Sequence, residues 1–224
     1  MNEQPALSSM LPKNPIIIAQ GERPAPPHAE SPTLRDRATD DLRFIRTTME
    51  RAGSFTSVSG VGMILVGFVG LGAFYFSRGM RPDLDTVSFL AVWLGAALAA
   101  TLVSWMTIRA KAERTRQSLA SGPARTFALA FVPSLLAGAV LTAALYYKGE
   151  GALLPATWLT LYGAAVGAGG AASVRPVLVM GAAFMILGAV AFRMPVQTQG
   201  YALAAGFGAL HIAFGTLIWK RYGG

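Results

Sequence analysis

The chain has 224 residues, of which 53% are hydrophobic and only 13% are charged, and its net charge is +8. A water-soluble domain would need far more charge, so this composition indicates an integral membrane protein. Membrane-spanning helices of about 20 residues with short connections would use most of the chain and leave no room for a separate catalytic domain. Because cysteine is absent, disulfides, thiolate nucleophiles and iron–sulfur clusters are excluded.

The excess of positive charge does not by itself indicate a nucleic-acid partner. The basic residues lie beside apolar segments, where they are better explained as orientation signals and as contacts to anionic lipid. We therefore expect the lipid bilayer, and not a nucleic acid, to be the main partner of the chain.

Two segments precede the apolar part of the sequence. Residues 1–31 combine six prolines with polar residues and predict a disordered cytoplasmic tail. Residues 32–53 predict an amphipathic juxtamembrane helix, because Ala38, Leu42, Ile45 and Met49 recur at spacings of four and three. This helix either anchors and orients the first span or offers a docking surface, and whether it lies on the membrane or continues into that span stays open.

The remaining segment, residues 54–222, predicts an all-α polytopic membrane helix bundle. It contains six apolar stretches, each near the length that crosses about 30 Å of hydrocarbon, and the fifth is the shortest. The six stretches are residues 55–77, 86–108, 126–147, 152–172, 176–193 and 200–220. Six spans place both chain ends on the same side of the membrane.

The distribution of basic residues predicts which side that is. With both ends in the cytoplasm, 15 of the 19 Lys and Arg residues lie inside, and the outer connections keep only Arg78, Arg81, Lys148 and Arg193. This asymmetry follows the positive-inside rule and predicts cytoplasmic N- and C-termini. Aromatic residues near span ends are interpreted as anchors at the headgroup level, namely Tyr75, Trp105, Tyr146, Tyr147, Trp158 and Trp219.

One ionisable side chain, His211, falls inside a predicted span. Ion-coupled transporters place carboxylates or lysines within their spans, and no acidic residue lies inside one here. Haem or metal ligation by His211 lacks a second ligand, since the only other histidine is His28 in the tail, so we expect no cofactor and no metal. An interhelical hydrogen bond is expected instead, with Thr157, Thr160 or Tyr162 as the partner.

The fourth span combines Pro155, two threonines and Tyr162 with a half that is rich in glycine. Either this helix is distorted and lines a cavity, or its small residues allow close packing, for which Gly163 and Gly167 already have the right spacing. No phosphate loop, GxSxG, HExxH or paired nucleophile and base occurs, so we predict that the protein is not an enzyme and has no catalytic residue.

Three stretches resemble an uncharacterised family of bacterial six-span membrane proteins. They are IRTTMERAGSFTSVSGVG from Ile45, LLPATWLTLYGAA from Leu153 and GYALAAGFGALHIAFGTLIWKRY from Gly200. The shared patterns are IR..MER before the first span and GFG.LHI..G in the last span. The resemblance implies a multi-pass protein of the bacterial inner membrane, often encoded beside a winged-helix regulator, and it implies no activity.

The leading functional hypothesis is a non-enzymatic signalling, regulatory or interaction component with an Arg-rich cytoplasmic face. That face would bind a soluble cytoplasmic protein, anionic lipid or another membrane subunit, through Arg43, Arg46, Arg51, Arg109, Arg114 and Arg116. A homo-oligomer is a further expected partner state. The alternative is a facilitative channel or transporter of a small solute, with a cavity among the fourth, fifth and sixth spans. His211, Tyr162, Thr157 and Thr160 are the candidate polar site in the membrane.

Overall fold

The computed structural model describes residues 39–45, 59–115, 122–171 and 173–222 of the chain. Residues 39–45 are helical and exposed, and they lie within the amphipathic helix expected over residues 32–53. The rest of that segment, and the tail expected over residues 1–31, lie outside the described residues.

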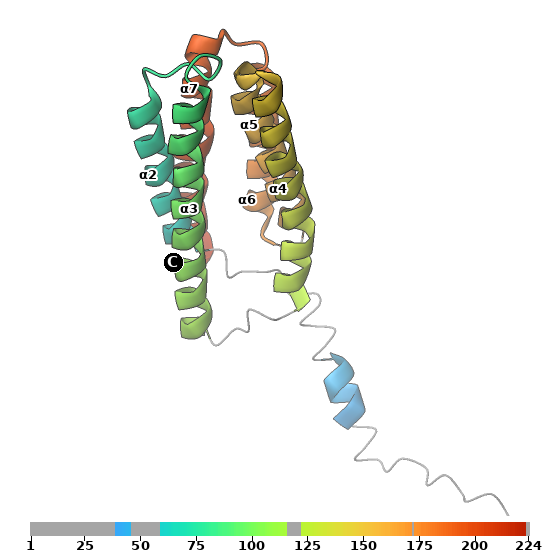
Figure 1. Ribbon diagram of the computed structural model, residues 1–224. Coiled ribbons are helices and arrows are strands. Elements are labelled where there is room, and N and C mark those ends of the chain that lie inside the picture. Colours follow the sequence, from blue (N-terminus) through green and yellow to red (C-terminus); the bar gives the residue numbers. More distant parts are fainter. Residues whose placement is uncertain (1–38, 46–58, 116–121, 172, 223–224) are drawn as a thin grey trace, which may run out of the picture. The chain divides into compact units, whose positions relative to one another are not determined.

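The described residues from Ser59 onward form a bundle of helices, and no β-strand occurs among them (Figure 1). Two 3-10 turns, η1 and η2, precede α5 and α7, and a π-helical segment, η3, separates α7 from α8. The elements are α2 (Gly60–Ser77), α3 (Thr86–Thr115), α4 (Gly122–Lys148), η1 (Gly151–Leu153), α5 (Leu154–Gly170), α6 (Arg175–Ala191), η2 (Val196–Thr198), α7 (Gln199–Leu203), η3 (Ala204–Leu210) and α8 (His211–Tyr222).

Five helical stretches of the described chain are long and apolar enough to cross a bilayer. They are Gly60–Ser77, Thr86–Arg114, Ala124–Lys148, Gly151–Gly170 and Val196–Arg221. A further apolar helix, α6, has 17 residues and is shorter. The prediction of an all-α, multi-pass membrane helix bundle is therefore confirmed.

Two predicted boundaries differ from the structure. The first helix begins at Gly60 and not at Phe55, because Ser59 has an extended backbone and its hydroxyl accepts the amide of Gly62 at 3.1 Å as an N-terminal cap. The α3 helix continues past the expected end at Ile108, into a polar turn where Arg109 and Glu113 form an i,i+4 ion pair at 2.9 Å.

The helices fall into two groups in Figure 1. One group contains α2, α3 and the last span, and the other contains α4, α5 and α6. In the second group, glycines bring the backbones of α5 and α6 together, since a Cβ added to Gly163 would lie 2.7 Å from the amide nitrogen of Met185. Close packing of small residues, one of the two interpretations of the fourth span, is therefore confirmed for Gly163.

The first span packs on the last one in the same way. A Cβ on Gly60 would lie 2.5 Å from the amide nitrogen of Trp219, and one on Gly70 would lie 2.5 Å from the carbonyl oxygen of Phe207. Each helix group is thus held by backbone contacts that leave no room for a larger side chain.

The connection between α2 and α3 contains an ion pair that should respond to acid. Arg81 donates to both carboxylate oxygens of Asp83, at 3.1 and 2.6 Å, and this hydrogen bonding lowers the pKa of Asp83 from its ordinary value of 3.8. Because the folded pKa lies below the unfolded one, the pair stabilises the connection above pH 3.8 and this stabilisation is lost as the pH falls through the folded pKa.

We expect NMR titration of the Asp83 carboxyl carbon to give a pKa below 3.8 in the native protein and a higher value in Arg81→Gln. The side chains are partly exposed, so we expect only a small change in overall stability. An unchanged pKa in Arg81→Gln would show that the ion pair does not form in solution.

Candidate functional site

A cavity of about 520 Å³ lies between the two helix groups. It is lined by side chains from α2, α3, α4 and α5 and by the last span, with Val177 and Met180 contributed by α6. Leu94 of α3 and Leu135 of α4 line the cavity and are 48% and 41% exposed, and α3 and α4 have little contact with each other, so we infer that the cavity opens between these two helices. In a membrane, this opening would face lipid tails.

Uncharged side chains surround this cavity. None of the described lining residues is Asp, Glu, Lys or Arg, and most are aliphatic, aromatic or glycine. Polar lining residues are Ser59, Thr101, Ser104, Thr107, Ser134, Thr142, Tyr162 and His211, together with the indoles of Trp93 and Trp158. The volume and the apolar lining with a few polar groups are typical of binding sites for small molecules.

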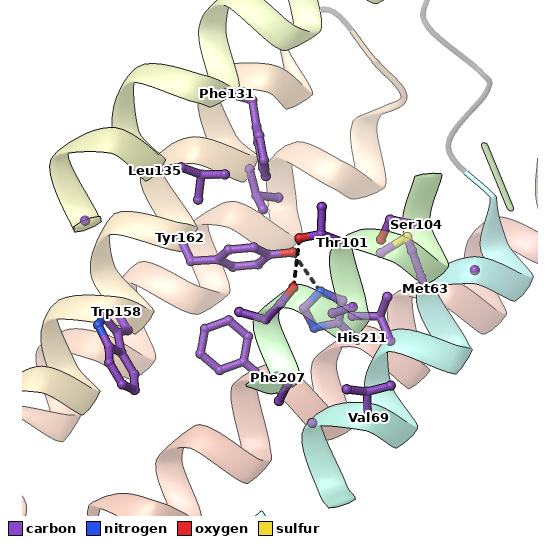
Figure 2. A pocket seen from close by; sticks show the side chains of 18 of the residues that line it. Met63, Val69, Thr101, Ser104, Phe131, Leu135, Trp158, Tyr162, Phe207 and His211 are labelled. Carbon is purple, nitrogen blue, oxygen red and sulfur yellow. Dashed lines mark hydrogen bonds between the residues drawn. The ribbon is translucent and has the colours of Figure 1, made fainter. Parts of the chain in front are cut away.

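Tyr162 and His211 form the polar centre of the cavity wall (Figure 2). The Tyr162 hydroxyl lies 2.8 Å from Nε2 of His211, and Nδ1 of His211 lies 3.4 Å from the carbonyl oxygen of Gly206. His211 is only 3% exposed, and the hydrogen bond joins α5 to α8. A buried imidazole is thereby paired on both ring nitrogens.

The carbonyl that Nδ1 of His211 contacts belongs to the π-helical segment η3, which ends at Leu210, directly before His211. The segment is closely packed, since a Cβ on Gly206 would lie 2.5 Å from Cδ2 of Leu159 and 2.9 Å from Cε1 of Phe184. Single π-helical turns inside α-helices are frequent at functional sites.

Aromatic rings hold the Tyr162 side chain in place. Its ring centre lies 4.9 Å from that of Phe184 and 5.1 Å from that of Phe207, both at steep angles, and 6.2 Å from that of Phe131. Edge-to-face geometry of this kind is favourable for aromatic pairs. The hydroxyl of Tyr162 is therefore fixed at the cavity surface.

The hydroxyl and indole groups of the wall are also hydrogen-bonded. The Thr101 hydroxyl donates to the carbonyl oxygen of Ala97 at 2.8 Å, within its own helix. The Thr142 hydroxyl donates to Gly138 at 2.7 Å and accepts Nε1 of Trp158 at 2.8 Å, which ties α4 to α5. Trp158 thus makes an inter-helix contact, and its interpretation as a headgroup anchor stays a prediction.

Of the three partners expected for His211, the structure brings Tyr162 to it. The Thr160 hydroxyl donates to the carbonyl oxygen of Ala156 at 2.8 Å, and neither Thr157 nor Thr160 belongs to the described cavity wall. The cavity was expected among the last three spans, and each of these contributes to its wall. Side chains of α3 and α4 supply the larger share of the described lining.

The Arg-rich face remains a prediction. Among its residues Arg43, Arg109 and Arg114 are exposed, and Arg109 pairs with Glu113. The other three, Arg46, Arg51 and Arg116, lie outside the described residues. No group of three or more His, Cys, Asp or Glu residues that could hold a metal occurs in the described part of the chain.

Sequence reasoning missed the contribution of α3 and α4. Trp93, Thr101, Ser104 and Thr107 follow one another at helical spacing along α3 and face the cavity. This stripe was the available signal, because hydroxyl residues repeated on one face of an apolar helix indicate a surface that does not face lipid.

Comparison with protein-family models, with curated proteins and with solved structures gives no match for this chain. The function is therefore inferred from the geometry of the site.

Proposed function

We propose that this chain is a six-span protein of the bacterial inner membrane that binds a small uncharged solute within the bilayer, as a facilitator or binding component. The observation that carries this proposal is the cavity of about 520 Å³ whose described wall has no charged side chain and opens sideways between α3 and α4. A wall without ionised groups favours uncharged molecules, because a charge in this apolar setting would have no counter-ion.

The six-span arrangement counts α6 with the five longer stretches. Its 17 residues rise about 26 Å, which is close to the thickness of a bilayer core. The ends of α3 and α8 and the start of α4 lie toward the lower end in Figure 1, and α3 and α8 carry Arg114, Lys220 and Arg221 in their last turns. We assign this end, and both chain termini, to the cytoplasm on the positive-inside rule.

A signalling or docking role for the Arg-rich face is compatible with solute binding, and the resemblance to the bacterial six-span family motivates it. No contact of the described residues favours a particular protein, lipid or second copy as the partner. The cavity is therefore the stronger basis for a functional assignment.

Filling the cavity should abolish solute binding. A Cβ on Gly138 would meet only Cδ1 of Leu161, at 3.8 Å, so Gly138→Leu should fold and place its side chain in the cavity. Bromobenzene quenches tryptophan fluorescence on contact and is the probe. The assay uses nanodiscs and a background in which the exposed Trp105 and Trp219 are replaced by Phe, so that only Trp93 and Trp158 fluoresce. Bromobenzene should quench these two indoles when Gly138 is present and should not quench them in Gly138→Leu.

The matched control is Gly95→Leu. Gly95 is exposed on α3, does not line the cavity, and has nothing within 4 Å of an added Cβ. Its quenching curve should equal that of the protein with glycine at both positions. Equal quenching in Gly138→Leu and Gly95→Leu would mean that bromobenzene reaches the indoles through lipid, and solute binding in the cavity would be rejected.

A further inference from the structure

The hydrogen-bonding groups of the cavity wall are unevenly divided between donors and acceptors. Both indole N–H groups of the wall are engaged within the protein, that of Trp93 with the Ser77 hydroxyl at 3.0 Å and that of Trp158 with Thr142 at 2.8 Å. Neither indole is therefore available to donate to a bound molecule.

The threonine hydroxyls of the wall donate their protons to their own helices. Thr101 donates to the carbonyl oxygen of Ala97 and Thr107 to that of Val103, both at 2.8 Å. A hydroxyl has one proton and two lone pairs, so each oxygen still accepts but no longer donates. These two positions of the wall therefore present acceptors.

The Tyr162 hydroxyl is also an acceptor toward the cavity. A carbonyl oxygen can only accept, so the contact between Nδ1 of His211 and Gly206 assigns the imidazole proton to Nδ1. The bare Nε2 then accepts the Tyr162 hydroxyl proton at 2.8 Å. Tyr162 consequently offers the cavity a lone pair and no proton, and His211 fixes this polarity.

We infer that the cavity selects a neutral molecule with an apolar body and an O–H donor, that is, an apolar alcohol or phenol. This inference rests on the proposed binding function. Tyr162 and Thr101 would accept the donor, while the serine hydroxyls of the wall can take either role and do not discriminate. The aromatic side chains of Phe131, Trp158 and Phe207 suit the apolar body, which enters between α3 and α4.

Three brominated probes of nearly equal shape test the donor requirement. They are 4-bromophenol, 4-bromoanisole, in which a methyl group replaces the proton, and the cation 4-bromobenzylammonium. The assay is the nanodisc quenching of Trp93 and Trp158, compared at equal probe concentrations in the bilayer. Because 4-bromophenol would form one additional hydrogen bond, we expect it to reach half-quenching at about fivefold lower concentration than 4-bromoanisole.

Equal half-quenching by 4-bromoanisole, or tighter binding of 4-bromobenzylammonium, would overturn the inference. If Gly138→Leu removes the quenching by bromobenzene but the phenol has no advantage, only the donor requirement fails. If none of the probes gives quenching that Gly138→Leu removes, the proposed function itself fails.

Two variants test where the donor is recognised. His211→Phe keeps an aromatic ring beside Phe184 and Phe207 but frees the Tyr162 proton, so the site gains a donor. The preference for 4-bromophenol over 4-bromoanisole should then fall to about twofold or less. Thr101→Val removes one acceptor at an exposed position and should weaken the phenol without affecting bromobenzene. An unchanged fivefold preference in both variants would contradict the assignment.

Competition distinguishes a lipid from a free solute as the source of the hydroxyl. Displacement of 4-bromophenol by 4-nonylphenol at much lower bilayer concentration than by phenol would support a tailed membrane alcohol extending between α3 and α4. Equal displacement by the two would support a small free phenol. Failure of both to displace 4-bromophenol would contradict recognition of the hydroxyl.

Discussion

Replacing Gly181 by alanine should destabilise the folded protein by about 2 kcal/mol, although it adds a single methyl group. That methyl would lie 2.6 Å from the Cα of Gly167 and 2.8 Å from the carbonyl oxygen of Gly163, both in the facing backbone of α5. A backbone cannot move aside as a flexible side chain can, so α5 and α6 must separate along their contact. Unfolding in mixed micelles with increasing SDS would measure the loss.

The control substitution should change the stability of the folded protein in the opposite direction. Gly95→Ala adds the same methyl to a helix where nothing lies within 4 Å, so the higher helix propensity of alanine, worth up to about 1 kcal/mol, is not opposed by a clash. Equal behaviour of Gly181→Ala and Gly95→Ala would show that the backbone contact between α5 and α6 is not tight in the membrane.

Removing the Phe184 ring should destabilise the folded protein by a similar amount. Phe184 is completely buried, and its ring contacts those of Tyr162, Phe207 and His211. Truncation to alanine leaves a void beside the Tyr162–His211 hydrogen bond, and loss of packing should cost about 2 kcal/mol, below the usual range for Phe→Ala because lipid is as apolar as the core.

The same unfolding titration measures this loss, and Phe68→Ala is the control. Phe68 is 59% exposed on α2, where its ring faces lipid in the folded protein, so its removal should change stability little. Binding of bromobenzene should also weaken in Phe184→Ala, because the neighbouring Tyr162 loses part of its support. A Phe184→Ala protein as stable as Phe68→Ala would contradict a packed aromatic core.

The sequence was sufficient for the helical class and for most of the spans. Apolar length and the backbone requirement for internal hydrogen bonds determine these features locally. The partner of His211 was partly predictable too, since a buried imidazole needs a polar neighbour and Tyr162 was one of three polar residues proposed on the fourth span.

The hydroxyl stripe of α3 was a signal for the cavity, but the aliphatic part of the cavity lining and the π-helical turn could not be predicted from the sequence. In a membrane, a helix face that borders a cavity and a face that borders lipid can both be apolar, so Leu94 and Leu135 give no distinguishing signal. The turn at Ala204–Leu210 depends on how Gly206 and Gly208 fit against Leu159 and Leu71, which are distant in sequence. Both features follow from tertiary packing.

The length of the short α6 helix makes the stability of the bundle depend on the thickness of the bilayer. With 17 residues it rises about 26 Å, against about 45 Å for the 30 residues of α3. A typical hydrocarbon core of about 30 Å exceeds the first length, so in the proposed six-span arrangement lipids beside α6 would thin locally, at a free-energy cost that grows with each ångström of mismatch. Vesicles with shorter acyl chains should therefore stabilise the folded bundle, and the membrane thickness that the cell maintains becomes a determinant of its stability.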